Sequence, residues 1–120
     1  MNRHAFAHDA VLALDEGGDE RAPGGTITVA LCGSWSHQPP CPLAPHHTAT
    51  HRDGAELTLR VLFAAYPVQE QRVRGLVEGA LARGEGEDPH GVRTTWRLLR
   101  AAPSPVRPEE RDRAERLTRS

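Results

Sequence analysis

Two segments of the chain alternate between apolar and polar residues with a period of two. In residues 26–32 every second position is apolar (Ile27, Val29 and Leu31). In residues 56–63 the same alternation recurs (Leu57, Leu59, Val61 and Phe63). This pattern is typical of half-buried β-strands, so it predicts two strands. Because consecutive strands are usually neighbours, we expect these two to lie side by side in one sheet.

A third segment has the period of an α-helix. After Pro67, the chain to about Arg83 carries one apolar stripe at positions i, i+3, i+4, i+7 and i+8 (Val73, Leu76, Val77, Ala80 and Leu81). This spacing predicts an amphipathic helix that packs on the sheet and ends at Gly84. Gly75 and Gly79 fall on its opposite side, where each weakens the helix by about 1 kcal/mol.

The remaining segments have weaker patterns. We interpret Ala10–Leu14 as a short first strand, with a helix over residues 5–14 as the alternative. Residues 94–100 are interpreted as another strand. Residues 85–91 are expected to form a loop. Pro108 opens a last helix over 109–118, whose apolar residues are Ala114 and Leu117.

Together these elements predict one α+β domain over residues 1–120. We expect a small antiparallel or mixed sheet of three to four strands, one packed amphipathic helix, and a mostly solvated C-terminal helix in residues 107–120. A ferredoxin-like variant is the nearest known arrangement, but the helix that it requires after the first strand is not predicted.

Composition narrows the functional classes. The length of 120 residues fits one domain, and 38% hydrophobic with 4% aromatic residues implies a core of Val, Leu and Ala. The net charge of −1 provides no general attraction for nucleic acid or anionic lipid. No apolar run reaches the length of a membrane span, and no secretory signal is seen, so we expect a cytoplasmic protein without nucleic-acid or membrane partners.

The connection at residues 33–55 is the chemically richest part of the chain. The stretch from Cys32 to His51 holds both cysteines and four of the seven histidines, with four prolines among them. Hairpin connections are usually two to five residues, and structureless loops beyond roughly 12–15 residues are commonly functional or disordered. This length and composition make the Cys/His/Pro-rich loop the candidate site.

The leading hypothesis is a metal site in this loop. Thiolate and imidazole are the ligands that zinc and copper prefer. The candidate ligands are Cys32, His37, Cys41 and either His46 or His47. Four ligands would form a closed structural Zn²⁺ site, whereas three would leave a position open for water or substrate. Copper is the alternative metal.

Several alternatives remain open for the same residues. Cys32 and Cys41 could form a disulfide, although a reducing cytosol favours a reversible redox pair over a structural one. The loop could also be a polar, proline-rich connection in which the cysteines are small buried residues. Trp35 is the candidate for stacking on a bound ligand, with packing over the sheet as its other interpretation.

Two further functional classes compete with metal binding. A metal-independent cyclase, isomerase or hydrolase could use His37, His51 and Asp53 for acid–base chemistry, or a loop cysteine as nucleophile. A non-catalytic interaction module could use the C-terminal helix or an exposed sheet edge, which would also permit a homodimer. We expect His4 and His8, near the N-terminus, to be surface residues.

Overall fold

The computed structural model describes residues 2–33, 44–88 and 90–119. Five strands form one antiparallel sheet in the order β2-β3-β1-β5-β4. The strands are β1 (His4–Leu14), β2 (His46–Asp53), β3 (Glu56–Ala65), β4 (Glu85–Glu87) and β5 (Arg93–Ser104). The predicted α+β class is confirmed, but the sheet has five strands where three to four were expected.

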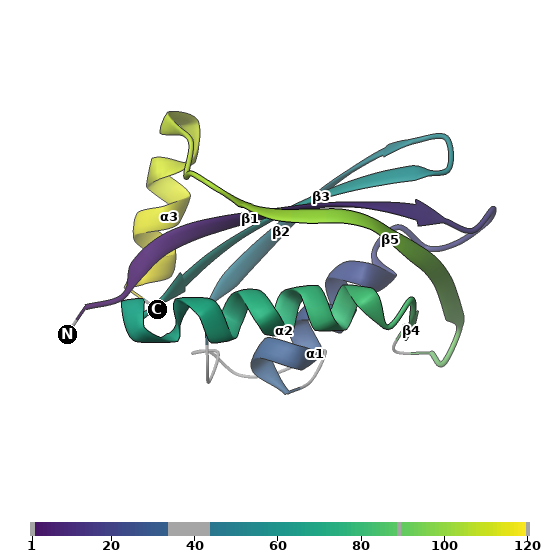
Figure 1. The fold of residues 1–120 in the computed structure, drawn as a ribbon, viewed down its shortest axis with the longest axis horizontal. Coiled ribbons are helices and arrows are strands. Elements are labelled where there is room, and N and C mark those ends of the chain that lie inside the picture. The colour runs from purple at the N-terminus through teal and green to yellow at the C-terminus, as the bar shows by residue number, and fades with distance from the viewer. Residues whose placement is uncertain (1, 34–43, 89, 120) are drawn as a thin grey trace.

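Three α-helices accompany the sheet, and each lies against one of its faces (Figure 1). They are α1 (Ala22–Cys32), α2 (Glu70–Ala82) and α3 (Arg111–Thr118). Short 3₁₀ turns precede the last two, η1 (Pro67–Gln69) and η2 (Pro108–Glu110). If the short strand β4 and the C-terminal helix α3 are left out, the strands and α-helices follow the order β-α-β-β-α-β along the chain. No helix among the described residues is long and apolar enough to cross a membrane.

The central strand β1 is covered on both faces. Ala10, Leu12 and Leu14 pack with residues of α1 and α2 in the main core. Ala7, on the opposite face, packs with Leu62 of β3 and Ala114 of α3 in a second, smaller core. The main core therefore lies between the sheet and the α1–α2 layer, while α3 covers the other face at one end of β1.

The expected strand at residues 26–32 is wrong, because this segment belongs to helix α1. Its apolar residues fit both periods, since Ile27 and Leu31 are also four positions apart on a helix. Both are buried, whereas Val29, which alternation would bury, is 40% exposed. The hydroxyls of Thr26 and Thr28 donate to the carbonyls of Pro23 and Gly24, 2.7 and 3.2 Å away, so the helix satisfies them internally.

The topology explains why this segment is helical. β3 pairs antiparallel with both β1 and β2, so β1 and β2 run parallel to each other. Parallel strands need a crossover connection, which is usually an α-helix. The parallel relation of β1 and β2 thus outweighs the strand-like alternation of residues 26–32. The neighbours of β3 are consequently β1 and β2, not residues 26–32.

The other predicted strands and helices are confirmed with changed boundaries, whereas two segments that were expected in loops are strands. β3 contains the alternating segment 56–63, β5 extends the predicted strand to Ser104, and α2 buries Val73, Val77 and Leu81 of the predicted stripe. Residues 46–53, expected within the long connection, form the edge strand β2, and residues 85–87, expected in a loop, form β4.

One side chain, Arg60 of β3, joins the segments around α3. Its Nε and Nη2 donate to both carboxylate oxygens of Glu110, at 2.8 and 2.7 Å. Nη1 donates to Asp9 and Ser104, at 2.9 and 2.8 Å, and Nη2 also donates to the Pro105 carbonyl at 2.7 Å. All five guanidinium N–H donors are used. Arg60 therefore ties β1, the end of β5 and the start of η2–α3 to β3.

Replacing Arg60 with Met should lower the free energy of unfolding by roughly 2–3 kcal/mol, because the carboxylates of Glu110 and Asp9 would lose their partner. Chemical denaturation measures this change. The control is Arg97→Met, since Arg97 is exposed on β5 and makes no ion pair with the described residues. Equal losses in the two variants would contradict the assigned role of Arg60.

The pH dependence of Glu110 gives a second prediction. Hydrogen bonding to Arg60 lowers the pKa of Glu110 from 4.5 to about 2. The pair therefore stabilises the fold fully above pH 4.5, and the stabilisation is lost as the pH falls toward 2. At pH 6 the Glu110→Gln variant should have a lower free energy of unfolding than the wild type. This difference should shrink as the pH falls from 4.5 toward about 2. A difference that stays constant in urea denaturation from pH 6 to pH 2 would refute this prediction.

Candidate functional site

The C-terminus of α1 and the start of β2 bring a cysteine beside a histidine. Cys32 is the last residue of α1, and Gly33, with φ 86°, closes the helix in the left-handed conformation. The described chain resumes at the buried Ala44, and His46 begins β2. Sγ of Cys32 lies 3.7 Å from Nδ1 of His46. Among the described residues that were selected from the sequence as metal ligands, these two are the pair that the structure places together.

Thr28 holds the other side of the His46 ring. It lies one turn before Cys32 on the same face of α1, with its Oγ1 3.1 Å from Nε2 of His46. The tautomer of the ring decides which of these two atoms donates the hydrogen bond. The carbonyl oxygen of Ala44 lies 3.2 Å from Nδ1 and can only accept, so this contact favours a proton on Nδ1. The sulfur of Cys32 is disulfide-bonded and has no proton to donate to the ring. The orientation of the imidazole is thus set by contacts at both nitrogens.

The remaining members of the predicted ligand set are not described. Trp35, His37 and Cys41 lie outside the described residues. Cys32 is disulfide-bonded, so its sulfur is oxidised in this structure. No group of three or more metal-ligating side chains occurs within residues 2–33, 44–88 and 90–119. The described part of the site is therefore the Cys32–Thr28–His46 cluster.

His47 belongs to the opposite face of the sheet from His46. Successive side chains of a strand point to opposite faces, and Nδ1 of His47 accepts a hydrogen bond from Arg113 of α3 at 3.3 Å. Burial, and next the charge of Arg113, lower the pKa of His47. His46 and His47 thus cannot bind one metal ion together with Cys32.

His51 and Asp53 lie toward the far end of β2. His51 is five positions from His46, about 16 Å at 3.3 Å per residue. Both side chains are exposed, and they share the face of His47 by alternation. The described chain therefore does not place them with the Cys32–His46 pair.

A buried polar cluster around His8 was missed from the sequence. The expectation that His8 is a surface residue is wrong, since it is 1% exposed, whereas His4 is exposed as expected. Nδ1 of His8 accepts from Nη1 of Arg74 at 2.9 Å, and Nε2 lies 2.7 Å from Oε2 of Glu78. Because a guanidinium can only donate, this geometry requires a neutral imidazole.

Arg74 connects this cluster to the rest of the fold. Its Nη1 also donates to the Ala7 carbonyl at 2.7 Å, and its Nε donates to Glu70 at 2.8 Å. The guanidinium lies over the rings of Phe6 and Phe63, 5.8 and 5.4 Å from their centroids. The i, i+4 spacing of residues 70, 74 and 78 was a sequence signal for a polar row on α2. Through these contacts, the cluster around the buried His8 fastens α2 to β1.

No protein-family model, curated protein or solved structure matches the chain. The functional interpretation therefore depends on the geometry and chemistry of the residues themselves.

The His8 cluster predicts a loss of stability below neutral pH. Burial lowers the pKa of His8; Glu78 opposes this shift and Arg74 adds to it. The contribution of His8 is therefore present above the ordinary value of 6.5 and is lost as the pH falls below it. His8→Gln should give a shallower decline of the free energy of unfolding between pH 7.5 and 5.5 than the wild type. His4→Gln, on the same strand, should leave the decline unchanged; equal slopes for all three proteins would contradict this account.

Proposed function

We propose that the chain binds a transition metal ion, with Zn²⁺ the first candidate and copper the alternative, through Cys32 and His46. The observation that carries this proposal is the 3.7 Å separation of Sγ and Nδ1. Two ligands of a tetrahedral zinc ion, with Zn–S about 2.3 Å and Zn–N about 2.0–2.1 Å, lie about 3.5 Å apart. The pair thus needs to move by only a few tenths of an ångström to share one ion.

The other ligands are expected from the sequence between these two residues. His37 and Cys41 are the candidates there, and both lie outside the described residues. We assign His46 instead of His47, because His47 faces α3 from the other side of the sheet. Thr28 would fix the ring of His46 through Nε2, as partners of metal-binding histidines commonly do.

The proposal applies to the reduced protein. Metal binding requires the thiolate of Cys32, whose sulfur is disulfide-bonded in this structure. A dithiol reductant would supply two electrons and two protons, converting the disulfide to two thiols, and metal binding would then release the thiol protons. The zinc-bound and disulfide forms are in this proposal two alternative states of the same residues.

A reversible thiol–disulfide function without metal is the second candidate. The specific observation in its favour is that the disulfide-bonded Cys32 lies next to His46. An adjacent imidazolium stabilises a thiolate and so promotes thiol–disulfide exchange. Metal stoichiometry distinguishes the two candidates, since this second function needs none.

We also infer that the fold is a ferredoxin-like variant with an added short strand and C-terminal helix. The support is the β-α-β-β-α-β order, together with the order β2-β3-β1-β5 of the four long strands. The helix missing from the expected arrangement is supplied by α1.

Reduced, untagged protein should bind about one zinc ion per chain by elemental mass spectrometry. His46→Ala should lose the metal because one ligand is removed, and Cys32→Ser should do so as well. His47→Ala is the matched control, since it changes the neighbouring residue on the opposite face, and it should keep full occupancy. Circular dichroism would verify that each variant is folded.

Full metal occupancy in both His46→Ala and Cys32→Ser would refute the assigned ligands. A reduced protein that binds no metal, but re-forms its disulfide reversibly in a glutathione buffer, would instead support the thiol–disulfide function.

A further inference from the structure

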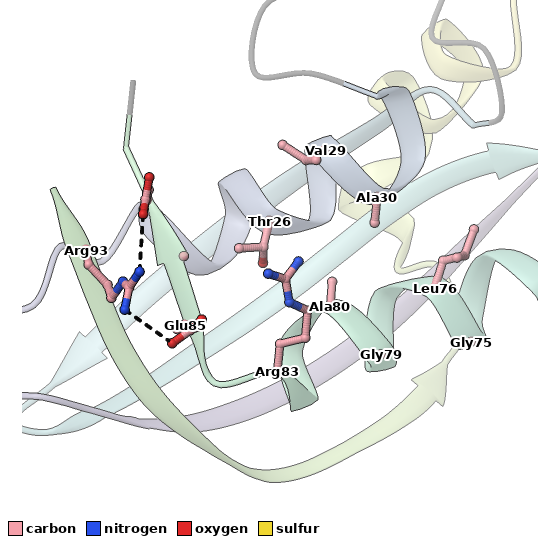
Figure 2. A pocket seen from close by; sticks show the side chains of 12 residues that line it. Thr26, Val29, Ala30, Gly75, Leu76, Gly79, Ala80, Arg83, Glu85 and Arg93 are labelled. Atoms are coloured by element: carbon pink, nitrogen blue, oxygen red, sulfur yellow. Dashed lines mark hydrogen bonds and ion pairs between the residues drawn. The ribbon is translucent and has the colours of Figure 1, made fainter. Parts of the chain in front are cut away.

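A groove runs between α1 and α2 on the outer side of the helix layer (Figure 2). Its volume is about 530 Å³, within the range of roughly 300–1,000 Å³ that is typical of small-molecule sites. Thr26, Val29 and Ala30 of α1 line one side. Gly75, Leu76, Gly79 and Ala80 of α2 line the other. Thr28 and Cys32 face β2 instead, so the groove is separate from the Cys32–His46 pair.

The floor of the groove is apolar and open. Val29 is 40% exposed there, and Gly75 and Gly79 are exposed one helical turn apart on α2. A Cβ added at either glycine would meet nothing within 4 Å. Alanine would therefore fit both positions and would favour the helix by about 1 kcal/mol each. No close contact in the described chain requires a glycine at either position, and the missing side chains leave this face of α2 open.

One end of the groove carries charged side chains from the end of α2, β4 and the start of β5. Arg93 lies 3.9 Å from Glu85 and 3.5 Å from Glu87, so its charge is offset by two carboxylates. The guanidinium of Arg83 makes no ion pair or hydrogen bond with the part of the chain that the structure describes. Figure 2 shows its guanidinium directed across the groove toward Thr26. The groove thus combines an apolar floor with a guanidinium that has no ion-pair partner among the described residues, while Arg83, Arg93, Glu85 and Glu87 together carry no net charge.

We propose that this groove binds a small amphipathic monoanion, a carboxylate with an unbranched apolar body. The carboxylate pairs with the guanidinium of Arg83, whose paired N–H donors match the two oxygens. The apolar body lies along Val29, Gly75 and Gly79, where it displaces water from exposed apolar surface. The N–H donors of Arg83 that have no partner in the described chain favour a carboxylate, and the size of the groove favours a small molecule.

The probe for this site is octanoate, compared with octan-1-ol as the uncharged analogue. Titration of ¹⁵N-labelled protein, followed by NMR chemical shifts, should show saturable binding of one octanoate per chain with shifts along α1 and α2. Arg83→Gln should weaken binding at least tenfold. Arg72→Gln is the matched control, because Arg72 is exposed on the same helix but does not line the groove, and it should leave the affinity unchanged.

Two glycine variants test the floor of the groove. Gly79→Leu should abolish octanoate binding by filling the groove. Gly75→Ala adds one carbon into open space, so it should raise the thermal stability while weakening binding, which separates loss of the site from loss of the fold. Absence of saturable octanoate binding, equal affinity for octan-1-ol, or an unchanged affinity in Arg83→Gln would each overturn the proposal.

Discussion

The burial of β1 on both faces is the constraint on which the rest of this structure depends. β1 pairs with β3 on one side and with β5 on the other, and helices cover both of its faces. A polar side chain on such a strand must find partners within the protein. His8 finds them in Arg74 and Glu78 of α2, and Asp9 finds one in Arg60 of β3. These polar residues thereby fix where α2 and the η2–α3 segment attach.

The position of β1 also determines where the candidate site forms. With β3 between them, β1 and β2 run parallel, so the chain must cross the sheet through α1. The crossover brings the C-terminus of α1 over the first residue of β2, where Cys32 and Thr28 contact His46. The two residues proposed to bind metal come from regular elements, which hold them more precisely than a loop would.

Helix α1 has two chemically different sides. Thr28 and Cys32 face β2 and the imidazole of His46, whereas Thr26, Val29 and Ala30 line the groove shared with α2. The first side offers soft ligands or an exchangeable disulfide. The second offers apolar surface next to the guanidinium of Arg83, which has no ion-pair partner within residues 2–33, 44–88 and 90–119. One short helix thus contributes to two proposed sites with separate chemistry.

The sequence by itself determined the elements whose pattern fits one period. The stripe on α2 and the alternation of β3 predicted those elements. The Cys/His-rich connection suggested Cys32 and His46 as members of one metal site; the structure brings these two side chains together, and the metal site itself stays a prediction. Only the tertiary structure decided the others. Residues 26–32 fit a strand and a helix equally, and the parallel relation of β1 and β2 selected the helix. Residues 46–53 are too polar to predict as a strand, yet pairing with β3 makes them one. His8 gave no sign of burial, because its partners on α2 lie more than sixty positions away in the chain.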